Sequence, residues 1–266
     1  MIRAATADDY DAFAGLFPQL GVEDPTPTRE RWVTDLVSET LVSERAGSID
    51  GYISFYTLSA VGYVRNLVVA PGARQQGIGG ELMRAAASAL RERGVAEWHL
   101  NVKRDNAAAI RLYESLGMRV EHRTIVLRLA WTQVPQLPAE PAVALPVAPD
   151  EDDDVERALG MLAGRIAMGR KRSGRVQLQL RDETCAPVGY ATFDPMLGAM
   201  PFRVLRPALA RTLLEALRPH ASQDTVRVVC DDDVALEQLL IGSGAETVLE
   251  LLHYRGRVPC VSRATP

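Results

Sequence analysis

The sequence predicts an α/β protein in which a mixed (α+β) sheet carries helices on both faces and the chain forms two tandem domains. Three observations support this prediction. The first 130 residues alternate short apolar runs with segments of helical periodicity. A strand, a glycine-bearing loop and a helix follow one another over residues 61–93. Weak copies of these patterns then recur, in the same order, in the second half.

The first half reads as β-α-α-β-β-β-α-β-α-β. Apolar, β-branched runs predict strands at residues 2–5, 40–45, 51–58, 61–70 and 97–102, and one or two more within 118–129. Apolar spacings of three and four residues predict helices at residues 10–17, 29–38, 78–93 and 106–116. Residues 18–28 are rich in proline, glycine and acidic side chains, and we expect a loop there.

The segment of residues 71–80 joins a buried strand to a helix. Pro71 and Gly72 end the strand, and Gly77 and Gly79 lie where the helix begins. The first N–H groups of a helix have no partners within it, and the positive end of the helix dipole lies beside them. Glycine lets a phosphate approach the backbone because it has no Cβ. We therefore expect an anion site here, with Arg74 as a neighbouring cation.

Several kinds of loop share these features. A P-loop requires Lys and then Ser or Thr after its last glycine, but Glu81 follows here. A dinucleotide-binding fingerprint requires a third glycine where Leu82 stands. A plain strand-to-helix turn remains open on this segment alone. So does an R/Q-x-x-G-x-G/A loop, which Arg74, Gly77 and Gly79 match.

A second motif lies one strand and one helix further along the chain. The pattern N-x-x-A-x-x-x-Y-x-x-x-G-φ, in which φ is apolar, is matched by Asn106, Ala109, Tyr113, Gly117 and Met118. The two motifs, in this order and on this series of elements, resemble the GNAT (N-acetyltransferase) superfamily over residues 1–130. Within it, the sequence is most similar to the ribosomal-protein N-terminal alanine acetyltransferases.

The resemblance implies that acetyl-CoA (coenzyme A) is the co-substrate. It places pantetheine where the strands at residues 61–70 and 97–102 separate, with backbone N–H groups of residues 76–80 on the pyrophosphate. A backbone N–H aimed at the thioester oxygen would stabilise the oxyanion as the amine attacks. The cofactor-binding residues that it implies are Leu67, Val68, Val69, Arg74, Gln75, Gln76, Gly77, Ile78, Gly79, Gly80, Asn106, Ala109 and Tyr113.

Tyr113 is the predicted catalytic side chain. A phenol with a pKa of about 10 remains a protonated donor at neutral pH, so it can supply a proton to the departing thiolate. By helical spacing alone, Tyr113 also fits a buried aromatic residue on an amphipathic helix. Asn106 has two interpretations as well, because the same residue suits a helix N-cap.

The general base is left open by the sequence. A lysine-like amine, with a pKa of about 10.4, must lose its proton before it attacks. Asn101 stands where the related alanine acetyltransferases carry a glutamate, and the strand at residues 61–70 has Arg65 and Asn66 where many relatives place an acid. An arginine at that place could orient an acidic acceptor. The remaining candidates for the base are a chain of water molecules or Glu23, Asp24 and Glu44.

The second half reads as a degenerate copy of the first. We expect domain 1 at residues 1–130, a proline-rich linker at 131–142 and domain 2 at 143–266. GYISF at residues 51–55 recurs as GYATF at 189–193. In the aligned copy the two loop glycines become Val204 and Arg206, Asn106 becomes Asp233, and Tyr113 becomes Leu240. The glycines and the tyrosine are lost together, as expected if both serve one cofactor.

Composition limits the other possibilities. A net charge of −4 argues against broad nucleic-acid binding, and no apolar run approaches the 18 residues of a membrane span. Three widely spaced cysteines, one of them Cys260, suit a reducing, cytoplasmic location. The four histidines show no ligand spacing, so we expect no metal. We also expect a monomer or homodimer.

The function predicted from these features is acetyl-CoA-dependent transfer of an acetyl group to a primary amine of a small molecule or peptide. The amine would attack the thioester directly in a ternary complex. The alternative is a non-catalytic acyl-CoA-binding or scaffold protein, because the strand acid is missing and one copy is degenerate. Tandem enzymes that resemble mycothiol synthases commonly keep the second copy active, which is the opposite of the pattern here.

Overall fold

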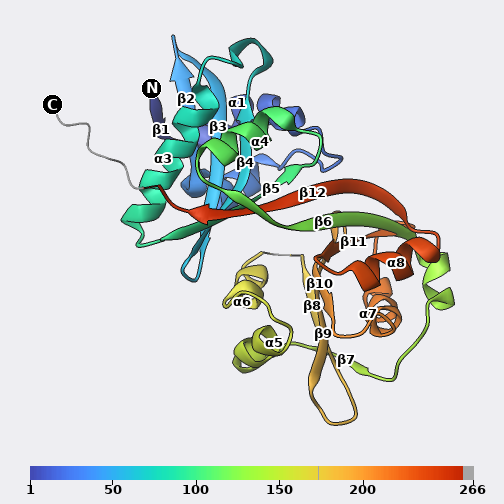
Figure 1. The fold of residues 1–266 in the computed structure, drawn as a ribbon. Helices are drawn as coiled ribbons and strands as arrows, with labels where there is room; N and C mark the ends of the chain where they lie inside the picture. The colour runs from blue at the N-terminus through green and yellow to red at the C-terminus, as the bar shows by residue number, and fades with distance from the viewer. Residues whose placement is uncertain (173, 260–266) are drawn as a thin grey trace. The chain divides into compact units, whose positions relative to one another are not determined.

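The computed structural model describes residues 1–172 and 174–259, and Cys260 lies outside the described residues. The chain divides into two compact units (Figure 1). The first unit consists of Met1–Glu121 together with residues 253–259, and the second unit of His122–Leu252. The compact units therefore differ from a simple linear division, because residues 253–259, the last that the structure describes, belong to the first unit.

The first unit is built on a mixed sheet. Its strands lie in the order β1-β2-β3-β4-β5, followed by the end of β12. Neighbours from β1 to β4 are antiparallel, and β4 and β5 are parallel. The strand bounds are Ile2–Ala4 (β1), Thr40–Arg45 (β2), Ser48–Leu58 (β3), Val61–Val69 (β4), Glu97–Lys103 (β5) and Glu246–Arg257 (β12).

Helices cover both faces of this sheet. On one face lies α3, whose Leu82 and Leu90 side chains pack against Gly51 and Gly62 of the strands. The opposite face holds an aromatic core in which Phe13 stacks on Trp32 with ring centroids 4.4 Å apart. The helical segments are Ala7–Asp9 (η1), Tyr10–Leu16 (α1), Phe17–Leu20 (η2), Arg29–Arg31 (α2), Trp32–Leu36 (η3), Val37–Glu39 (η4), Pro71–Ala73 (η5), Ile78–Glu92 (α3) and Ala107–Ser115 (α4).

One predicted helix is not continuous. The sequence predicts a single helix at residues 29–38, but α2 gives way at Trp32 to a π-helical segment and then to a 3₁₀ turn. The Trp32 indole N–H donates to the Thr6 carbonyl at 3.2 Å, and both Trp32 and Leu36 are buried. The wider π turn keeps these two side chains in the core, so tertiary packing overrides the local helical pattern.

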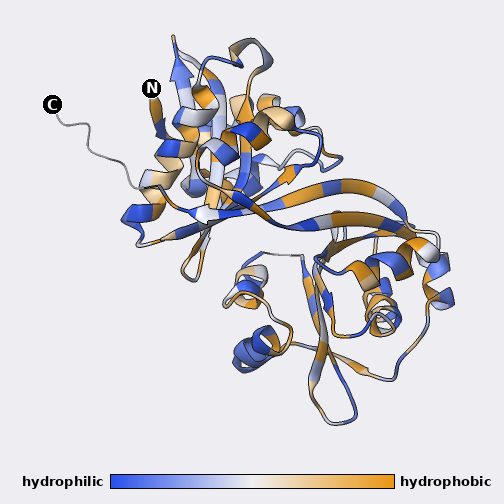
Figure 2. Ribbon diagram, in the orientation of Figure 1, coloured by the Kyte–Doolittle hydropathy of each residue, from blue (hydrophilic) through white to orange (hydrophobic). Residues whose placement is uncertain are grey.

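The second unit has its own sheet, in the order β6-β11-β10-β9-β8-β7. The strands are Arg119–Ala130 (β6), Val143–Pro146 (β7), Val176–Arg181 (β8), Pro187–Asp194 (β9), Gly198–Val204 (β10) and Thr225–Asp231 (β11). The helices are Trp131–Gln136 (η6), Pro149–Glu151 (η7), Asp152–Ala158 (α5), Arg165–Arg170 (α6), Leu209–Leu217 (α7), Arg218–His220 (η8) and Val234–Gly242 (α8). Figure 2 shows apolar stretches along the strands and a strongly hydrophilic α5.

The two halves repeat the same series of elements, as the sequence predicts. In the first half the order is β3-β4-α3-β5-α4-β6, and in the second half β9-β10-α7-β11-α8-β12. The last strand of each series leaves its own half: β6 lies next to β11 in the second unit, and the end of β12 lies next to β5 in the first. Each unit is therefore completed by a strand from the other half of the chain.

Candidate active site

Two parallel strands of the first unit separate halfway along their length. β4 and β5 pair only from Val61 opposite Glu97 to Val64 opposite Leu100, although both strands continue beyond this point. The separation coincides with a β-bulge, because Ser54 of β3 faces Asn66 whereas Phe55 faces Val64. Bulges bend a strand and are common beside functional sites. The backbone therefore opens at the bulge, and a gap begins there.

Leu67, Val68 and Val69 lie on the edge of this gap. Each is opposite a residue of β3, and β5 no longer pairs with β4 at this level. Alternate backbone N–H and C=O groups of a strand point to its two sides, so groups on the β5 side are available to an extended ligand. The sequence-based assignment of these three backbones thus has a suitable geometry.

The loop after β4 leads directly into α3. Gly77 has a φ of +82° and precedes the first residue of the helix, Ile78. The Glu81 N–H donates to the Gly77 carbonyl at 3.0 Å, whereas the N–H groups of Ile78, Gly79 and Gly80 belong to the open first turn. A Cβ at Gly77 would meet no atom within 4 Å, so glycine is required there by the backbone conformation. A 15-residue helix with this start can bind an anion.

Arg74 lines the entrance to the loop. Its Nε donates to the Val69 carbonyl at 3.1 Å, and its Nη2 donates to Gln19 Oε1 at 3.1 Å. The Gln76 amide donates to the Gly72 carbonyl at 3.3 Å, and the exposed Gln75 has a φ of +63°. The side chains of Arg74 and Gln76 therefore stabilise the loop itself, which leaves backbone N–H groups to meet a phosphate.

Tyr113 is buried on α4, with 6% of its surface exposed. Its ring centroid lies 6.2 Å from that of Tyr254 on β12. Burial raises the pKa of Tyr113, so its hydroxyl remains a proton donor well into the alkaline range. Asn106 caps α4: its Oδ1 accepts the N–H of Ala109 at 3.1 Å. The capping interpretation of Asn106 thus accounts for its side chain.

A carboxylate that the sequence did not indicate lies beside the bulge. Glu39, at the end of η4, lies 3.3 Å from Arg65 at the bulge, and the Arg65 guanidinium lies over the Tyr56 ring. The only sequence signal for Glu39 was its place just before a strand. Glu44, in contrast, pairs with Arg3 at 2.6 Å, so this base candidate is already held by an arginine.

The second unit carries a run of basic residues on α6 and just after it, which are Arg165, Arg170, Lys171, Arg172 and Arg175, and two of them form ion pairs. Arg170 binds the Asp152 carboxylate through two hydrogen bonds of 2.6 Å, and Arg175 lies 3.4 Å from Asp194. Asp152 belongs to the acidic first turn of α5. Both arginines thus serve the packing of the second unit.

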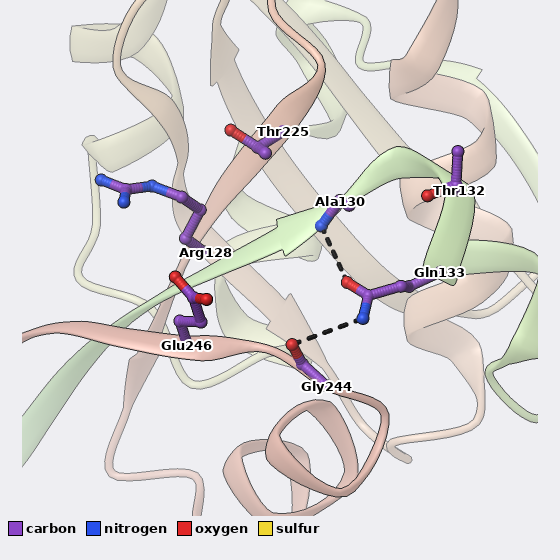
Figure 3. A pocket seen from close by; sticks show the side chains of 7 residues that line it. All are labelled: Arg128, Ala130, Thr132, Gln133, Thr225, Gly244 and Glu246. Carbon is purple, nitrogen blue, oxygen red and sulfur yellow. Dashed lines mark hydrogen bonds between the residues drawn. The ribbon is translucent and has the colours of Figure 1, made fainter.

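The second unit contains a polar pocket. Figure 3 shows the residues that line it, which are Arg128, Ala130, Thr132, Gln133, Thr225, Gly244 and Glu246. Thr225 is the first residue of β11, whereas Asp231 ends it. In a fold of this kind, ligands bind at the carboxyl ends of parallel strands. This pocket is therefore not the counterpart of the gap in the first unit.

Comparisons with known proteins agree with this architecture. The profile of the acetyltransferase (GNAT) family matches residues 7–118. An uncharacterized N-acetyltransferase of Archaeoglobus fulgidus is 32% identical over 135 residues, covering 44% of this chain and 92% of that protein. A ribosomal protein bS18-alanine N-acetyltransferase of Escherichia coli is 48% identical over 52 residues, which cover 20% of this chain and only 35% of that protein.

Solved structures resemble the whole chain. A putative acetyltransferase from Pyrococcus horikoshii has a TM-score of 0.75 at 19% identity, covering 97% of this chain and 89% of that one. A tandem GNAT protein from the clavulanic acid biosynthesis pathway has a TM-score of 0.63 at 18% identity, covering 98% and 99%. The fold is therefore that of a tandem α/β acetyltransferase. The chain belongs to the acetyltransferase (GNAT) family.

Among the helices in the described part of the chain, none is both long enough and apolar enough to cross a bilayer.

Proposed function

We propose that the first unit transfers an acetyl group from acetyl-CoA to a primary amine of a small molecule or peptide, by direct attack in a ternary complex. The observation that carries this proposal is the gap between β4 and β5, which leads to the Gly77 turn and the start of α3. Acetyl-CoA is the co-substrate of this family. The Escherichia coli relative is named for an alanine acceptor on a ribosomal protein, which supports an amine acceptor here.

Each part of the cofactor has a complementary region. The pyrophosphate would receive N–H groups from Gln76 to Gly80 at the positive end of α3. Pantetheine would pair with the free edge of Leu67–Val69 as an added strand. A backbone N–H in that stretch would stabilise the thioester oxyanion as the amine attacks. We assign the second unit no cofactor, because it lacks the loop glycines.

Tyr113 would supply the proton to the departing thiolate. Its pKa is raised by burial, so the phenol is in the donating form when the thiolate, with a pKa near 8.5, departs. The step transfers one proton from the tyrosine oxygen to sulfur, and solvent restores it. The proposal therefore predicts that kcat falls when only this hydroxyl is removed.

A screen of primary amines with acetyl-CoA, followed by free-thiol release, tests the proposal. The wild type should release coenzyme A with at least one amine, and Tyr113→Phe should lower kcat about 10- to 100-fold. Calorimetry should give the same acetyl-CoA affinity for both proteins, because the ring remains in place. Tyr254→Phe is the matched control, since it removes the neighbouring hydroxyl, which bonds Glu114 at 3.3 Å, and should leave kcat unchanged within threefold.

A non-catalytic acyl-CoA-binding protein is the alternative, and Asn101 favours it because an amide cannot act as a general base. If no amine in a broad library causes release of free thiol, although acetyl-CoA binds tightly, that alternative would be supported. Failure to bind acetyl-CoA at all would contradict both.

A further inference from the structure

A chain of polar side chains crosses the face of the first unit's sheet that lies opposite α3. His99 of β5 and His253 of β12 are hydrogen-bonded through Nδ1 and Nε2, respectively, at 2.8 Å. His99 Nε2 lies 3.0 Å from Glu97 Oε1. At the other end, His253 Nδ1 lies 2.9 Å from Asn101 Oδ1 and 3.3 Å from the Tyr63 hydroxyl. Both histidines are buried, with 6% and 4% of their surfaces exposed.

The hydrogen bonds define where the protons lie when both rings are neutral. The hydrogen bond from Arg255 lowers the pKa of Glu97, so this carboxylate only accepts and His99 Nε2 must carry a hydrogen. His99 Nδ1 is then an acceptor for the His253 Nε2–H. It follows that His253 Nδ1 holds a lone pair, which can accept from the Tyr63 hydroxyl. The contact with Asn101 Oδ1 is a hydrogen bond only when Nδ1 carries a hydrogen, because an amide oxygen accepts. The neutral pair thus presents a basic nitrogen at the Asn101 end.

Charged side chains surround the pair. Glu97 and Glu121 provide two carboxylates around the pair, and Arg255 binds both, at 2.8 and 2.9 Å. An imidazolium formed at the pair would therefore lie among two carboxylates and one guanidinium. In the protonated pair, Nδ1–H of His253 donates to Asn101 Oδ1, so the amide stabilises the charged form. Tyr63, stacked on His99 with centroids 5.7 Å apart, is a further titratable group that faces the pair.

The same surroundings argue against a metal ion at the two histidines and Glu121, although their ligand atoms lie within 4.8 Å of one another. All four ring nitrogens already have hydrogen-bonding neighbours. A divalent cation would also lie beside the Arg255 guanidinium, which repels it. The arrangement is that of a hydrogen-bonded histidine pair.

The basic end of the pair lies where the two strands separate. Leu100 is the last residue of β5 that pairs with β4, and the exposed Asn101 follows it. Tyr63 immediately precedes Val64, the last paired residue of β4. The lone pair of His253 Nδ1 is therefore directed to the beginning of the gap that would hold the thioester.

We propose that His253, coupled to His99, accepts the proton of the attacking amine through the Tyr63 hydroxyl, and thereby replaces the missing carboxylate at Asn101. The inference rests on the proposed acetyl transfer. The ammonium gives one proton to the Tyr63 oxygen while the Tyr63 proton moves to His253 Nδ1. The Nε2 proton of His253 then moves to His99 Nδ1, which leaves an imidazolium beside Glu97 and a neutral amine.

The test measures acetyl transfer to the most active amine from the screen across pH 6 to 10. His253→Gln should lower kcat/KM at pH 7 about 100-fold, with acetyl-CoA affinity unchanged. For wild type, kcat/KM should level off once the pair is neutral. In the variant it should keep rising about tenfold per pH unit toward the amine pKa, because only the free amine reacts. Tyr63→Phe, which keeps the ring stack, should show the same pH profile.

His220→Gln is the control, because His220 is an exposed residue at the end of η8. It should match the wild type at every pH. Wild-type turnover with an unchanged profile in both His253→Gln and Tyr63→Phe overturns the relay and leaves the acetyltransferase proposal intact. Loss of wild-type turnover on treatment with a chelator also overturns it, because the pair would then hold a metal. Absence of wild-type turnover with any amine overturns the acetyltransferase proposal, and the relay with it.

Discussion

The corresponding strand pairs of the two units both separate, but only one pair is bridged by side chains. β4 and β5 pair up to Val64, and β10 and β11 pair only at Ala199 opposite Val228. In the second unit a cluster of side chains then connects the ends of β10 and β11. Arg203 lies opposite Tyr190, just as Val68 lies opposite Tyr52 in the repeated hairpin. Its guanidinium binds Asp231 Oδ2, at the end of β11, at 2.8 Å. A charged side chain thus stands where the first unit offers open backbone.

The difference shows how one copy of a duplicated fold can lose a ligand without losing its architecture. Asp231 also accepts hydrogen bonds from His122 at 2.7 Å and Thr124 at 2.6 Å, so β6, β10 and β11 are joined at one carboxylate. The sequence alignment places Val204 and Arg206 at Gly77 and Gly79, but the structure corrects it: Val204 ends β10 opposite Gly189, as Val69 lies opposite Gly51. The helix that corresponds to α3 begins later, at Leu209, after an N-cap alanine and not a glycine. Arg206 is held by Glu140 in an ion pair. Side-chain contacts have replaced the features that would bind a cofactor.

The largest effect is expected from removing the glycine that precedes the helix α3 in the first unit. Gly77→Val puts a β-branched residue at a φ of +82°, which disfavours the turn before α3. We expect acetyl-CoA affinity to fall about 100-fold, equivalent to roughly 3 kcal/mol, as measured by calorimetry.

Gly94→Val is the matched control for this substitution. Gly94 follows the other end of α3 with a φ of +75°, and a Cβ there also meets nothing within 4 Å. Its stability should fall as in Gly77→Val, but its acetyl-CoA affinity should stay within threefold of the wild type. Equal affinities for the two variants would show that the Gly77 turn has no part in binding.

The loop and the Tyr113 helix could be predicted from the sequence because each motif is local. Glycines at the start of a helix and a tyrosine at helical spacing can be recognised from neighbouring residues, without knowing how the strands pair. His253 could not be predicted in the same way, since it is 154 residues from His99 and reaches it only because β12 joins the first unit. The Arg203–Asp231 contact is equally non-local. The sequence could show that the second half lacks the loop glycines, but it could not show which side chains contact one another in that region.

A moderate effect is expected from breaking the cluster in the second unit. Burial opposes ionisation of Asp231, but the Thr124 hydrogen bond and the Arg203 charge lower its pKa. Asp231→Asn should destabilise the protein by about 1 kcal/mol in denaturant unfolding at pH 7, because the carboxylate is partly solvated. A lowered pKa means that this stabilisation exists above the unfolded carboxyl pKa of about 3.9, so the difference should vanish as pH falls below it.

Asp154→Asn is the control for the cluster, because its pair with Arg157 is largely exposed, at 71% and 73% of the two side chains. It should change stability by less than about 0.5 kcal/mol. The Asp231→Asn protein should still bind one acetyl-CoA per chain, since opening the strand ends does not restore the glycines. A second bound acetyl-CoA would show that the contact between Arg203 and Asp231 alone prevents the second unit from binding the cofactor.

The smallest effect concerns a feature that both units share. Asn106 and Asp233 occupy the same place in the repeat, and each caps its helix by accepting an N–H, from Ala109 at 3.1 Å and from Leu236 at 2.9 Å. Replacing either with alanine should cost about 1 kcal/mol of stability, and the capping variants Asn106→Ser and Asp233→Ser should restore most of it. If Asn106 serves only as a cap, Asn106→Ser should also bind acetyl-CoA within threefold of the wild type. A tenfold weaker affinity with normal stability would instead mean that Asn106 contacts the cofactor. The capping residue would then have two roles in the first unit and only one in the second.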